Sequence, residues 1–299
     1  MNELISVIMP TYKRKYTMIE RAINSILNQT YKNIELIIVD DSPESFSERK
    51  IIKEKILSIK DKRVRYIQHE VNKGACVARN TGIKNSKGSI IAFLDDDDEW
   101  LPTKLEEQMK CLHEENVDMV YCFWIKHIIG KKKTVEKLRT LTKRPDETAY
   151  ESLLYKNYIG STSLVLAKKE CFDKVGLFKE DMPSCQDWEM WLRIAKEFNV
   201  GCVKKPLLIY YDHREERITT NVAKQIAGHE EIFKICSKDL ETHPKALKSQ
   251  YYKLALIYAD NKEFKKAFKV WNKSNKVRPN NIKESFLSLL KIIKRCLFK

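Results

Sequence analysis

Short apolar runs and segments of helical periodicity alternate along the first hundred residues of the chain. The apolar runs are rich in β-branched residues and lie at residues 6–10, 35–39, 64–67 and 89–94. Runs of this length and composition predict buried strands. Between them, apolar residues recur at helical spacing, as in residues 18–27. This alternation predicts an α/β fold, with a parallel sheet and helices on both of its faces.

The second half of the chain loses this regular alternation. The pattern predicts a helix ending near residue 115, strands at 119–124, 162–166 and 206–211, and a helix at 187–198. Residues 126–148 are polar and basic, which is typical of a long loop. From about residue 220 onward only helical patterns remain, so we place a boundary after residue 221.

Four consecutive aspartates, Asp95 to Asp98, follow the apolar run that ends at Leu94. Other polar groups follow earlier strands, at Pro10–Tyr12 and at Asp40–Asp41. In parallel sheets, ligands bind beyond the carboxyl ends of the strands, so these three segments should converge. Clustered carboxylates can hold a divalent cation, since hard cations take oxygen ligands. A solvated acidic turn is the alternative for the aspartates taken alone.

Six short sequence blocks, which follow one another in a fixed order along the chain, together resemble a known family. They are SVIMPTY (6–12), SILNQTY (25–31), IIVDDS (37–42), GACVARNTGI (74–83), FLDDDDEWLP (93–102) and QDWEMWLR (186–193). In this order they resemble the family 2 glycosyltransferases of the GT-A fold, over roughly residues 4–215. The resemblance implies a nucleotide-sugar-dependent transferase, with a catalytic domain at 1–221 and a small all-helical region at 222–299.

The resemblance also implies which residues bind the donor nucleotide. These are Pro10, Thr11, Tyr12, Asp41, Arg79, Asn80, Asp95 and Asp96. Asp41 would accept the N–H of a uracil, whereas Asp40 is expected to be structural. Arg79 would lie near the diphosphate, because a guanidinium matches phosphate geometry. A surface salt bridge is the alternative for Arg79.

The D-x-D motif of the family corresponds to Asp95–Asp97, which implies Mn²⁺ or Mg²⁺ as a cofactor. Asp97 would be the direct metal ligand, and Asp95 would bind the ribose or reach the metal through water. The roles of Asp96 and Asp98 stay open, since four aspartates permit a register error of one. The metal would stabilise the departing diphosphate as a Lewis acid. His213, after the last strand, would approach the metal or the phosphates, although a lone histidine is more often structural.

Asp187 is the candidate catalytic base by the same resemblance. Many family members have Glu-Asp here, whereas this chain has Gln186-Asp187. In an inverting reaction, one carboxylate removes the proton of the acceptor hydroxyl as that oxygen attacks the anomeric carbon. An aspartate that caps a helix is the alternative. Residues 191–193 do not make the Q-x-x-R-W signature of processive synthases, so one or a few sugars would be added.

Charge is uneven along a chain whose net charge is +15. From residue 245 to 299 there are 15 Lys and Arg residues against three acids. This segment could meet an anionic membrane or a protein partner. Nucleic acid is not an expected partner, because exposed aromatics do not interleave with the lysines. The eight cysteines are scattered without a C-x-x-C pair, which fits a reducing cytosol and a cytoplasmic protein, peripheral to the membrane at most.

Residues 248–281 resemble one tetratricopeptide repeat, a helix-turn-helix of 34 residues. The matching positions are Tyr251, Leu254, Ala255, Tyr258, Ala267, Trp271, Ser274 and Pro279. A last basic amphipathic helix follows, with an apolar stripe at residues 282, 286, 289, 290, 293 and 297. The stripe could lie on an anionic membrane surface or pack against the repeat, and the pattern leaves both open.

We therefore expect a metal-dependent, inverting glycosyltransferase. It would move a sugar from a UDP-hexose type donor to a hydroxyl of a glycan or lipid-linked acceptor, in surface polysaccharide biosynthesis. The alternative is a catalytically degenerate transferase that acts as a repeat-mediated binding protein. A sugar-nucleotidyltransferase or a dehydrogenase is disfavoured, because no glycine-rich phosphate loop follows the first strand.

Overall fold

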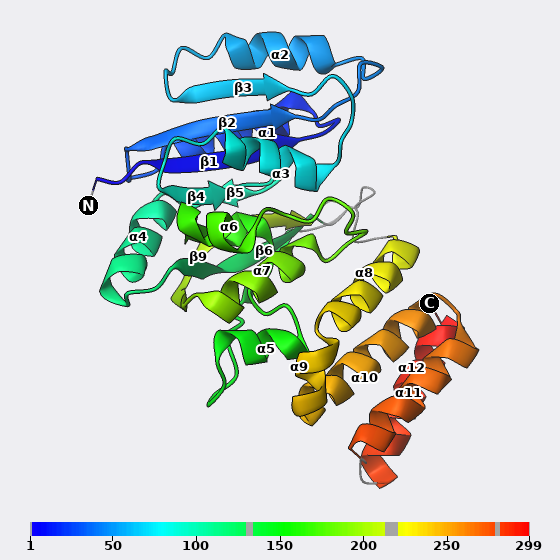
Figure 1. The fold of residues 1–299 in the computed structure, drawn as a ribbon. Helices are drawn as coiled ribbons and strands as arrows, with labels where there is room; N and C mark the ends of the chain where they lie inside the picture. The colour runs from blue at the N-terminus through cyan, green and yellow to red at the C-terminus, as the bar shows by residue number, and fades with distance from the viewer. Residues whose placement is uncertain (1, 130–133, 213–220, 279–281, 299) are drawn as a thin grey trace. The chain divides into compact units, whose positions relative to one another are not determined.

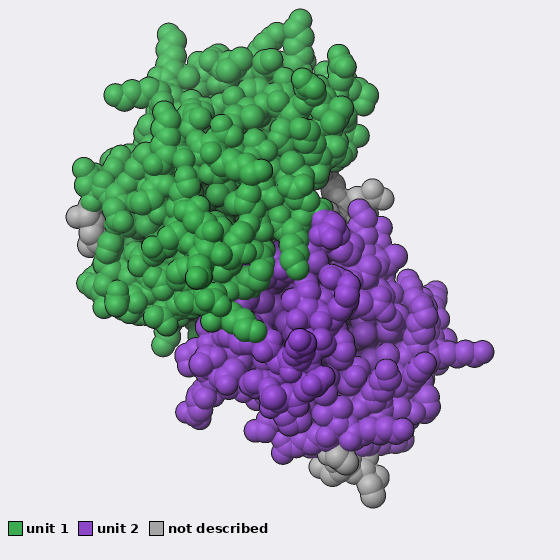
Figure 2. Space-filling model, in the orientation of Figure 1, with its two compact units in different colours: residues 1–142, 159–180, 193–214 green, residues 143–158, 181–192, 215–299 purple. Residues whose placement is uncertain are grey.

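Residues 2–129, 134–212, 221–278 and 282–298 are described by a computed structural model. The chain forms two compact units, which Figure 2 shows in green and purple. The sheet unit contains residues 1–142, 159–180 and 193–214, and the helical unit contains residues 143–158, 181–192 and 215–299. Two earlier segments of the chain thus group with the C-terminal helices. The predicted division into domains at residue 221 stays a prediction.

The sheet unit holds all the strands that the described residues form. Its strands are β1 (Ile5–Thr11), β2 (Ile34–Asp40), β3 (Val64–Gln68), β4 (Ile90–Phe93), β5 (Glu99–Trp100), β6 (Met119–Ile129), β7 (Thr134–Arg139), β8 (Leu166–Lys168) and β9 (Val200–Asp212). Its helices are α1 (Tyr16–Leu27), α2 (Arg49–Leu57), α3 (Ala75–Lys84), α4 (Lys104–Glu114), the 3₁₀ helix η1 (Thr162–Leu164) and α6 (Lys169–Val175). The strands form one sheet in the order β3-β2-β1-β4-β8-β6-β9-β5, with β7 paired to β6 (Figure 1).

Helices cover both faces of the parallel part of the sheet. Ile5, Val7 and Met9 alternate along β1 and pack in the large core that contains the buried side of α1. Ile8 points to the opposite face, where it meets Gly82 of α3 so closely that a Cβ there would lie 2.3 Å from an Ile8 methyl carbon. This alternation follows from the period of two along a strand. The predicted α/β architecture is confirmed.

The four strands of the first hundred residues, β1 to β4, pair in parallel as predicted, and β8 adds antiparallel pairs with β4 and β6. Two local predictions further along the chain were wrong. The predicted strand at 162–166 is mostly the 3₁₀ helix η1, and β8 starts only at Leu166. The predicted loop at 126–148 contains the end of β6 and its antiparallel partner β7. Lysine-rich composition hid these paired strands, because ladder hydrogen bonds join backbone groups whatever the side chains are.

The helical unit confirms that only helices follow residue 220 in the described part of the chain. They are α8 (Val222–Ile235), α9 (Ser237–Thr242), α10 (Pro244–Asp260), α11 (Phe264–Val277) and α12 (Ile282–Phe298). The short α5 (Ala149–Tyr155) belongs to this unit, and α7 (Gln186–Glu197) has residues in both units. α10 and α11 form a helical hairpin whose turn is residues 261–263. Membership of the tetratricopeptide class stays a prediction.

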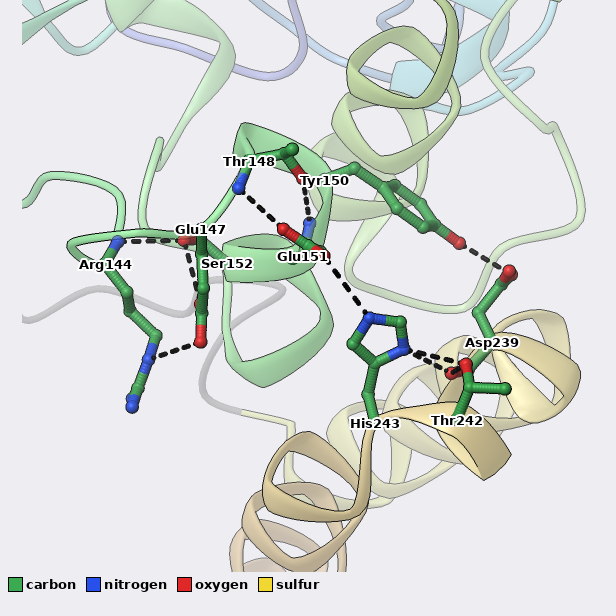
Figure 3. A network of polar contacts seen from close by, with 9 residues as sticks. All are labelled: Arg144, Glu147, Thr148, Tyr150, Glu151, Ser152, Asp239, Thr242 and His243. Carbon is green, nitrogen blue, oxygen red and sulfur yellow. Dashed lines mark hydrogen bonds and ion pairs between the residues drawn. The ribbon is translucent and has the colours of Figure 1, made fainter.

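A polar network ties α5 to α9 and α10, which explains why residues 143–158 belong to the helical unit (Figure 3). Thr148 and Glu151 form a reciprocal capping box at the start of α5. The Glu151 carboxylate also lies 3.6 Å from His243 Nε2. Tyr150 donates a hydrogen bond of 2.7 Å to Asp239 Oδ2, in the neighbouring helix α9.

Helix α12 buries only part of the predicted stripe, of which Leu289 packs against the core of the helical unit. Ile292 and Cys296, which lie outside that stripe, are buried in the core of the helical unit. Phe286, Ile293 and Leu297 belong to the stripe and are exposed by 61%, 38% and 60%. The helix carries apolar residues on two sides, and the repeat helices cover only one of them.

Candidate active site

The ends of three adjacent strands meet, as the sequence predicted. Thr11 ends β1 and accepts, through its carbonyl, a bond of 2.9 Å from the backbone N–H of Asp41. The Thr11 hydroxyl donates a bond of 2.7 Å to Asp96 Oδ2, 85 residues further along the chain. Neighbouring parallel strands end at the same edge of a sheet, so this convergence follows from the strand order.

The four aspartates after β4 alternate between buried and partly exposed. Asp96 and Asp98 are 5% and 1% exposed. The side chains of Asp95 and Asp97 are 30% and 16% exposed. A tight turn, in which the Asp98 N–H donates to the Asp95 carbonyl, produces this pattern. The cluster therefore presents two carboxylates spaced by one residue.

Two arginines hold these carboxylates in place. Arg14 lies 2.9 Å from Asp96 Oδ1 and 3.3 Å from Asp97 Oδ2. Arg79 donates a bond of 2.7 Å to Asp95 Oδ1. Burial raises the pKa of Asp96 to about 6, and repulsion from Asp97 adds to this, while Arg14 and the bond from Thr11 act in the opposite direction. Arg79 is only 9% exposed, so its ion pair with Asp95 lies largely inside the protein.

Arg14 and the residues of η1 are site members that the sequence reasoning missed. The backbone N–H of Asp95 donates to Ser163 Oγ at 3.0 Å, and Thr162 Oγ1 lies 3.4 Å from Asp95 Oδ1. The sequence could have indicated Arg14, because it is a cation just after the strand end at Thr11. The sequence could not have indicated Ser163, because its segment has no chemical motif and reaches Asp95 only through tertiary structure.

Asp41 lies in a cradle formed by the loop that precedes α3. Its carboxylate accepts bonds from the backbone N–H groups of Lys73 and Gly74, at 2.8 and 2.7 Å. His69 Nδ1 lies 2.7 Å from Asp41 Oδ1, and its Nε2 lies 3.0 Å from the Thr81 hydroxyl. Gly74 has φ of 92°, a conformation that side chains disfavour. Three donors thus fix the orientation of the Asp41 carboxylate.

The other predicted residues near this edge differ in exposure. Asp40 accepts bonds from the Tyr66 hydroxyl and from the Ser42 N–H, at 2.6 and 2.9 Å. Burial and the Asp40 carboxylate raise the pKa of Tyr66 far above its usual value. Pro10 lies within β1, paired with Val39. Tyr12, just after the strand, is 44% exposed, so its ring is available for stacking.

Asn80 uses its amide to fix another segment. Its Nδ2 donates to the Phe178 carbonyl at 2.9 Å, and its Oδ1 accepts from the Phe178 N–H at 3.0 Å. The same Nδ2 lies 3.2 Å from Glu180 Oε1, and Asn80 is only 2% exposed. These contacts place Asn80 under the loop at 178–180, whereas its neighbour Arg79 contacts the aspartates.

Asp187 is the second residue of α7 and belongs to the helical unit. Its Oδ2 accepts a bond of 3.1 Å from Asn157 Nδ2, and its Oδ1 accepts from the Trp188 N–H at 2.8 Å. Trp188 is buried and donates its indole N–H to the Leu153 carbonyl. The carboxylate thus has a fixed orientation on a rigid helix. His213, which the sequence placed near the metal or the phosphates, lies outside the described residues.

Hard oxygen ligands dominate the aspartate turn. Of the two Asp95 oxygens, only Oδ1 has a partner among the described residues, which leaves Oδ2 able to bind a ligand. Within that same part of the chain, no three His, Cys, Asp or Glu side chains gather to hold a metal ion. Two carboxylates that keep some exposure fit the donor chemistry of Mg²⁺ or Mn²⁺, which prefer carboxylate and water oxygens.

Comparison with known proteins gives the family. The family model described as glycosyl transferase family 2 matches residues 6–176. A glucosyltransferase of Escherichia coli, UDP-Glc:α-D-GlcNAc-diphosphoundecaprenol β-1,3-glucosyltransferase WfgD, is 31% identical over 75% of this chain and 82% of its own length. The chain therefore belongs to glycosyl transferase family 2, and it is a glycosyltransferase.

Solved structures agree on the fold. The Staphylococcus aureus protein TarS, residues 1–349 in complex with UDP-GlcNAc, has a TM-score of 0.60 over 91% of this chain and 90% of that one, at 16% identity. The mannosyltransferase PcManGT of Pyrobaculum calidifontis, in complex with GDP-Man and Mn²⁺, has a TM-score of 0.56 over 100% and 88%, also at 16% identity. At this identity, the likeness carries the GT-A fold alone.

None of the helices in the described residues combines the length and the apolar character that crossing a bilayer requires.

Proposed function

We propose that this glycosyltransferase transfers a hexose from a UDP-linked donor, with inversion and with a divalent metal ion, to a hydroxyl of a glycan or lipid-linked acceptor. The observation that carries the proposal is the aspartate turn. Asp95 and Asp97 keep partly exposed carboxylates at the carboxyl end of β4, while Asp96 and Asp98 are buried beside them. This spacing is what a D-x-D motif needs.

Asp97 and Asp95 would hold the metal ion. Mg²⁺ is commonly bound by one or two carboxylates together with substrate phosphates and water, and Mn²⁺ suits the same ligands. When bound, the ion would supply Lewis-acid stabilisation of the negative charge on the leaving diphosphate. Arg79 and Arg14 already lie beside these carboxylates, so they add positive charge where the diphosphate would lie.

Asp41 and Tyr12 would bind the nucleobase. An ionised carboxylate offers about four acceptor positions, and three of those on Asp41 are used by His69, Lys73 and Gly74. The remaining position suits the N–H of a uracil. The exposed ring of Tyr12 could stack on the base. A UDP donor is also named for the E. coli relative and appears in the TarS complex.

Asp187 would be the base that deprotonates the acceptor hydroxyl. The bonds from Asn157 and from the Trp188 N–H keep the carboxylate in one orientation. A fixed base is effective because proton transfer needs a short, aligned contact in the transition state. The acceptor class follows from the E. coli relative, whose name gives a sugar linked to diphosphoundecaprenol as its acceptor.

Thermal shift separates the donor classes directly. UDP, GDP and other nucleoside diphosphates would be compared with and without Mn²⁺, because a ligand that binds only the folded state raises its apparent stability. We expect a stabilising shift with UDP that requires Mn²⁺. A larger shift with GDP would overturn the uracil assignment. Equal shifts with and without Mn²⁺ would overturn the metal assignment.

Turnover then tests the reaction itself. Release of UDP from UDP-hexoses would be measured with and without a diphospholipid-linked acceptor. Loss of hydrolysis in Asp97→Ala, with an unchanged melting temperature, would support the metal site. Unchanged turnover in that variant would overturn it.

A further inference from the structure

The helical unit encloses a hollow that the proposed reaction does not use. Its volume is about 790 Å³, and residues of α10, α11 and α12 and of the segment around α5 line it. Five of the lining side chains are cations, and one is an acid. They are Arg144, Lys245, Lys248, Arg278 and Lys291, with Glu284 as the acid. Arg144 forms an ion pair of 3.1 Å with Glu147. Cations still outnumber acids around the hollow, so an anionic ligand would stabilise the arrangement.

The hollow also has a rigid aromatic wall. Trp271 is 9% exposed and donates its indole N–H to Ser288 of α12 at 2.9 Å. The Arg144 guanidinium lies 4.1 Å from the centre of the Tyr155 ring. Tyr252 completes the aromatic lining. Cationic and aromatic groups side by side suit a ligand that carries both an anionic group and apolar surface.

Exposed apolar side chains concentrate on α11 and α12, two of the helices that line this hollow. Twelve large hydrophobic side chains are exposed among the described residues, and six of them belong to α11 and α12. These six are Phe264, Phe268, Phe286, Leu287, Ile293 and Leu297. A gathering of exposed apolar side chains on neighbouring helices is a candidate interaction surface.

The helical period relates the stripe on α12 to the hollow. At about 100° per residue, Phe286, Ile293 and Leu297 fall on one line along α12. Leu287 lies to one side of that line and Lys291 lies beyond it, and both border the hollow. Lys283 and Lys294 fall between the line and the hollow on the same helix. An apolar line flanked by lysines is the pattern of a helix at the surface of an anionic membrane.

We propose that the hollow and the exposed side of α12 form one site for an anionic lipid surface. The five cations of the hollow bind headgroup phosphates, and Phe286, Ile293 and Leu297 enter the boundary between headgroups and acyl chains. Lysine stems add apolar contact while their ammonium groups stay at the phosphates. The site places the helical unit at the surface of a bilayer.

Vesicle flotation tests the proposal with the full chain. The vesicles contain either phosphatidylcholine alone or one part phosphatidylglycerol to two parts phosphatidylcholine. We expect binding to the second kind only, weakening as salt rises. Removing two cations in Lys245→Gln/Lys291→Gln should weaken binding roughly 25-fold, since each lysine near an anionic surface contributes a factor of about five. Phe286→Gln/Ile293→Gln should weaken it at least about tenfold.

A matched control comes from the same unit. Lys269 and Lys273 line a different hollow, of about 430 Å³, so Lys269→Gln/Lys273→Gln removes the same charge from another place. The control should lose less than about fivefold. An equal loss in the control would overturn the assignment to this hollow.

Two further outcomes would overturn the proposal. One is absence of binding to the phosphatidylglycerol vesicles. The other is binding of inorganic pyrophosphate to the wild type, lost in Lys245→Gln/Lys291→Gln, without any vesicle binding, which would assign the hollow to a soluble phosphate. Hydrolysis of a soluble donor and the melting temperature should be unchanged in all three variants, because the substituted side chains are exposed.

Discussion

Charged residues are paired around the aspartate turn of the sheet unit, whereas cations outnumber acids around the hollow of the helical unit. At the end of β4, Asp96 is bound by Arg14 and Thr11, and Asp95 by Arg79. In the helical unit, five cations line one hollow with Glu284 as the single acid. The first arrangement fixes side chains before a ligand arrives, which lowers the reorganisation that binding requires. The second has an excess of positive charge, which favours a large anionic partner over a small, precisely positioned ligand.

The two units also differ in how completely they bury their apolar side chains. In the sheet unit, the strands β1, β2 and β4 bury nearly every apolar side chain. In the helical unit, α12 buries Ile292 and Cys296 and leaves Phe286 and Leu297 exposed. The comparison teaches that the first unit is built to hold a small ligand rigidly, whereas the second keeps surface available for contact.

The largest expected effect concerns the aspartate turn. Asp97→Asn should lower the kcat/KM of transfer on the order of 1,000-fold, because the loss of a metal ligand removes several kcal/mol of transition-state stabilisation. The melting temperature should barely change, since Asp97 is partly exposed. Asp173→Asn, at an exposed carboxylate on α6, is the matched control and should keep full activity. A large drop in melting temperature would assign Asp97 to structure instead.

A second carboxylate tests whether the helical unit takes part in the chemistry. Asp187→Asn should lower kcat at least about 100-fold, because general base catalysis typically contributes that much or more. Donor binding, measured by thermal shift with UDP and Mn²⁺, should persist. The control is Asp181→Asn, an exposed carboxylate in the same unit. If kcat survives in Asp187→Asn, the helical unit supplies no base.

Acid should destabilise the helical unit through His229. Burial lowers the pKa of His229 to about 4, with a further contribution from Lys253, and its Nδ1 has no hydrogen-bond partner among the described residues. Because the unfolded chain binds a proton near pH 6.5 and the folded chain does not, stability falls as pH drops from about 6.5 to 4. The loss at pH 4 should be about 2–3 kcal/mol.

His229→Gln removes this titration, so the free energy of unfolding should depend less on pH in that window. Urea unfolding at pH 4.5 and pH 7 measures the difference. The same pH dependence in the variant and the wild type would show that another group titrates.

The smallest of these effects concerns Asn80, which the family resemblance placed with the donor. Asn80→Ala should lower the free energy of unfolding by about 2 kcal/mol, because it leaves the Phe178 N–H and carbonyl without their partner. Asn85→Ala, at an exposed amide in the same segment, should cost less than about 0.5 kcal/mol. An equal loss of unfolding free energy in the two variants would show that the bonds from Asn80 to Phe178 do not stabilise the sheet unit.

Local sequence patterns predicted some parts of the fold and the site and missed others. The four strands at 6–10, 35–39, 64–67 and 89–94 were predicted because each is a short apolar run. The β6–β7 pairing was missed, because polar composition hides backbone pairing. Arg14 was missed although it follows a strand end, since nothing local says that it reaches Asp96, 82 residues away.

By itself, the sequence determined the family, the α/β class and the strand ends where polar residues gather, because ordered motifs and apolar periodicity are local properties. Only the tertiary structure decided which aspartates face outward, since one turn after β4 sets the direction of each side chain. It also decided that Asn80 holds Phe178, and that α12 buries Ile292 rather than Phe286. A helix with apolar residues on two sides can bury either one, and the partners that choose between them are distant in the sequence.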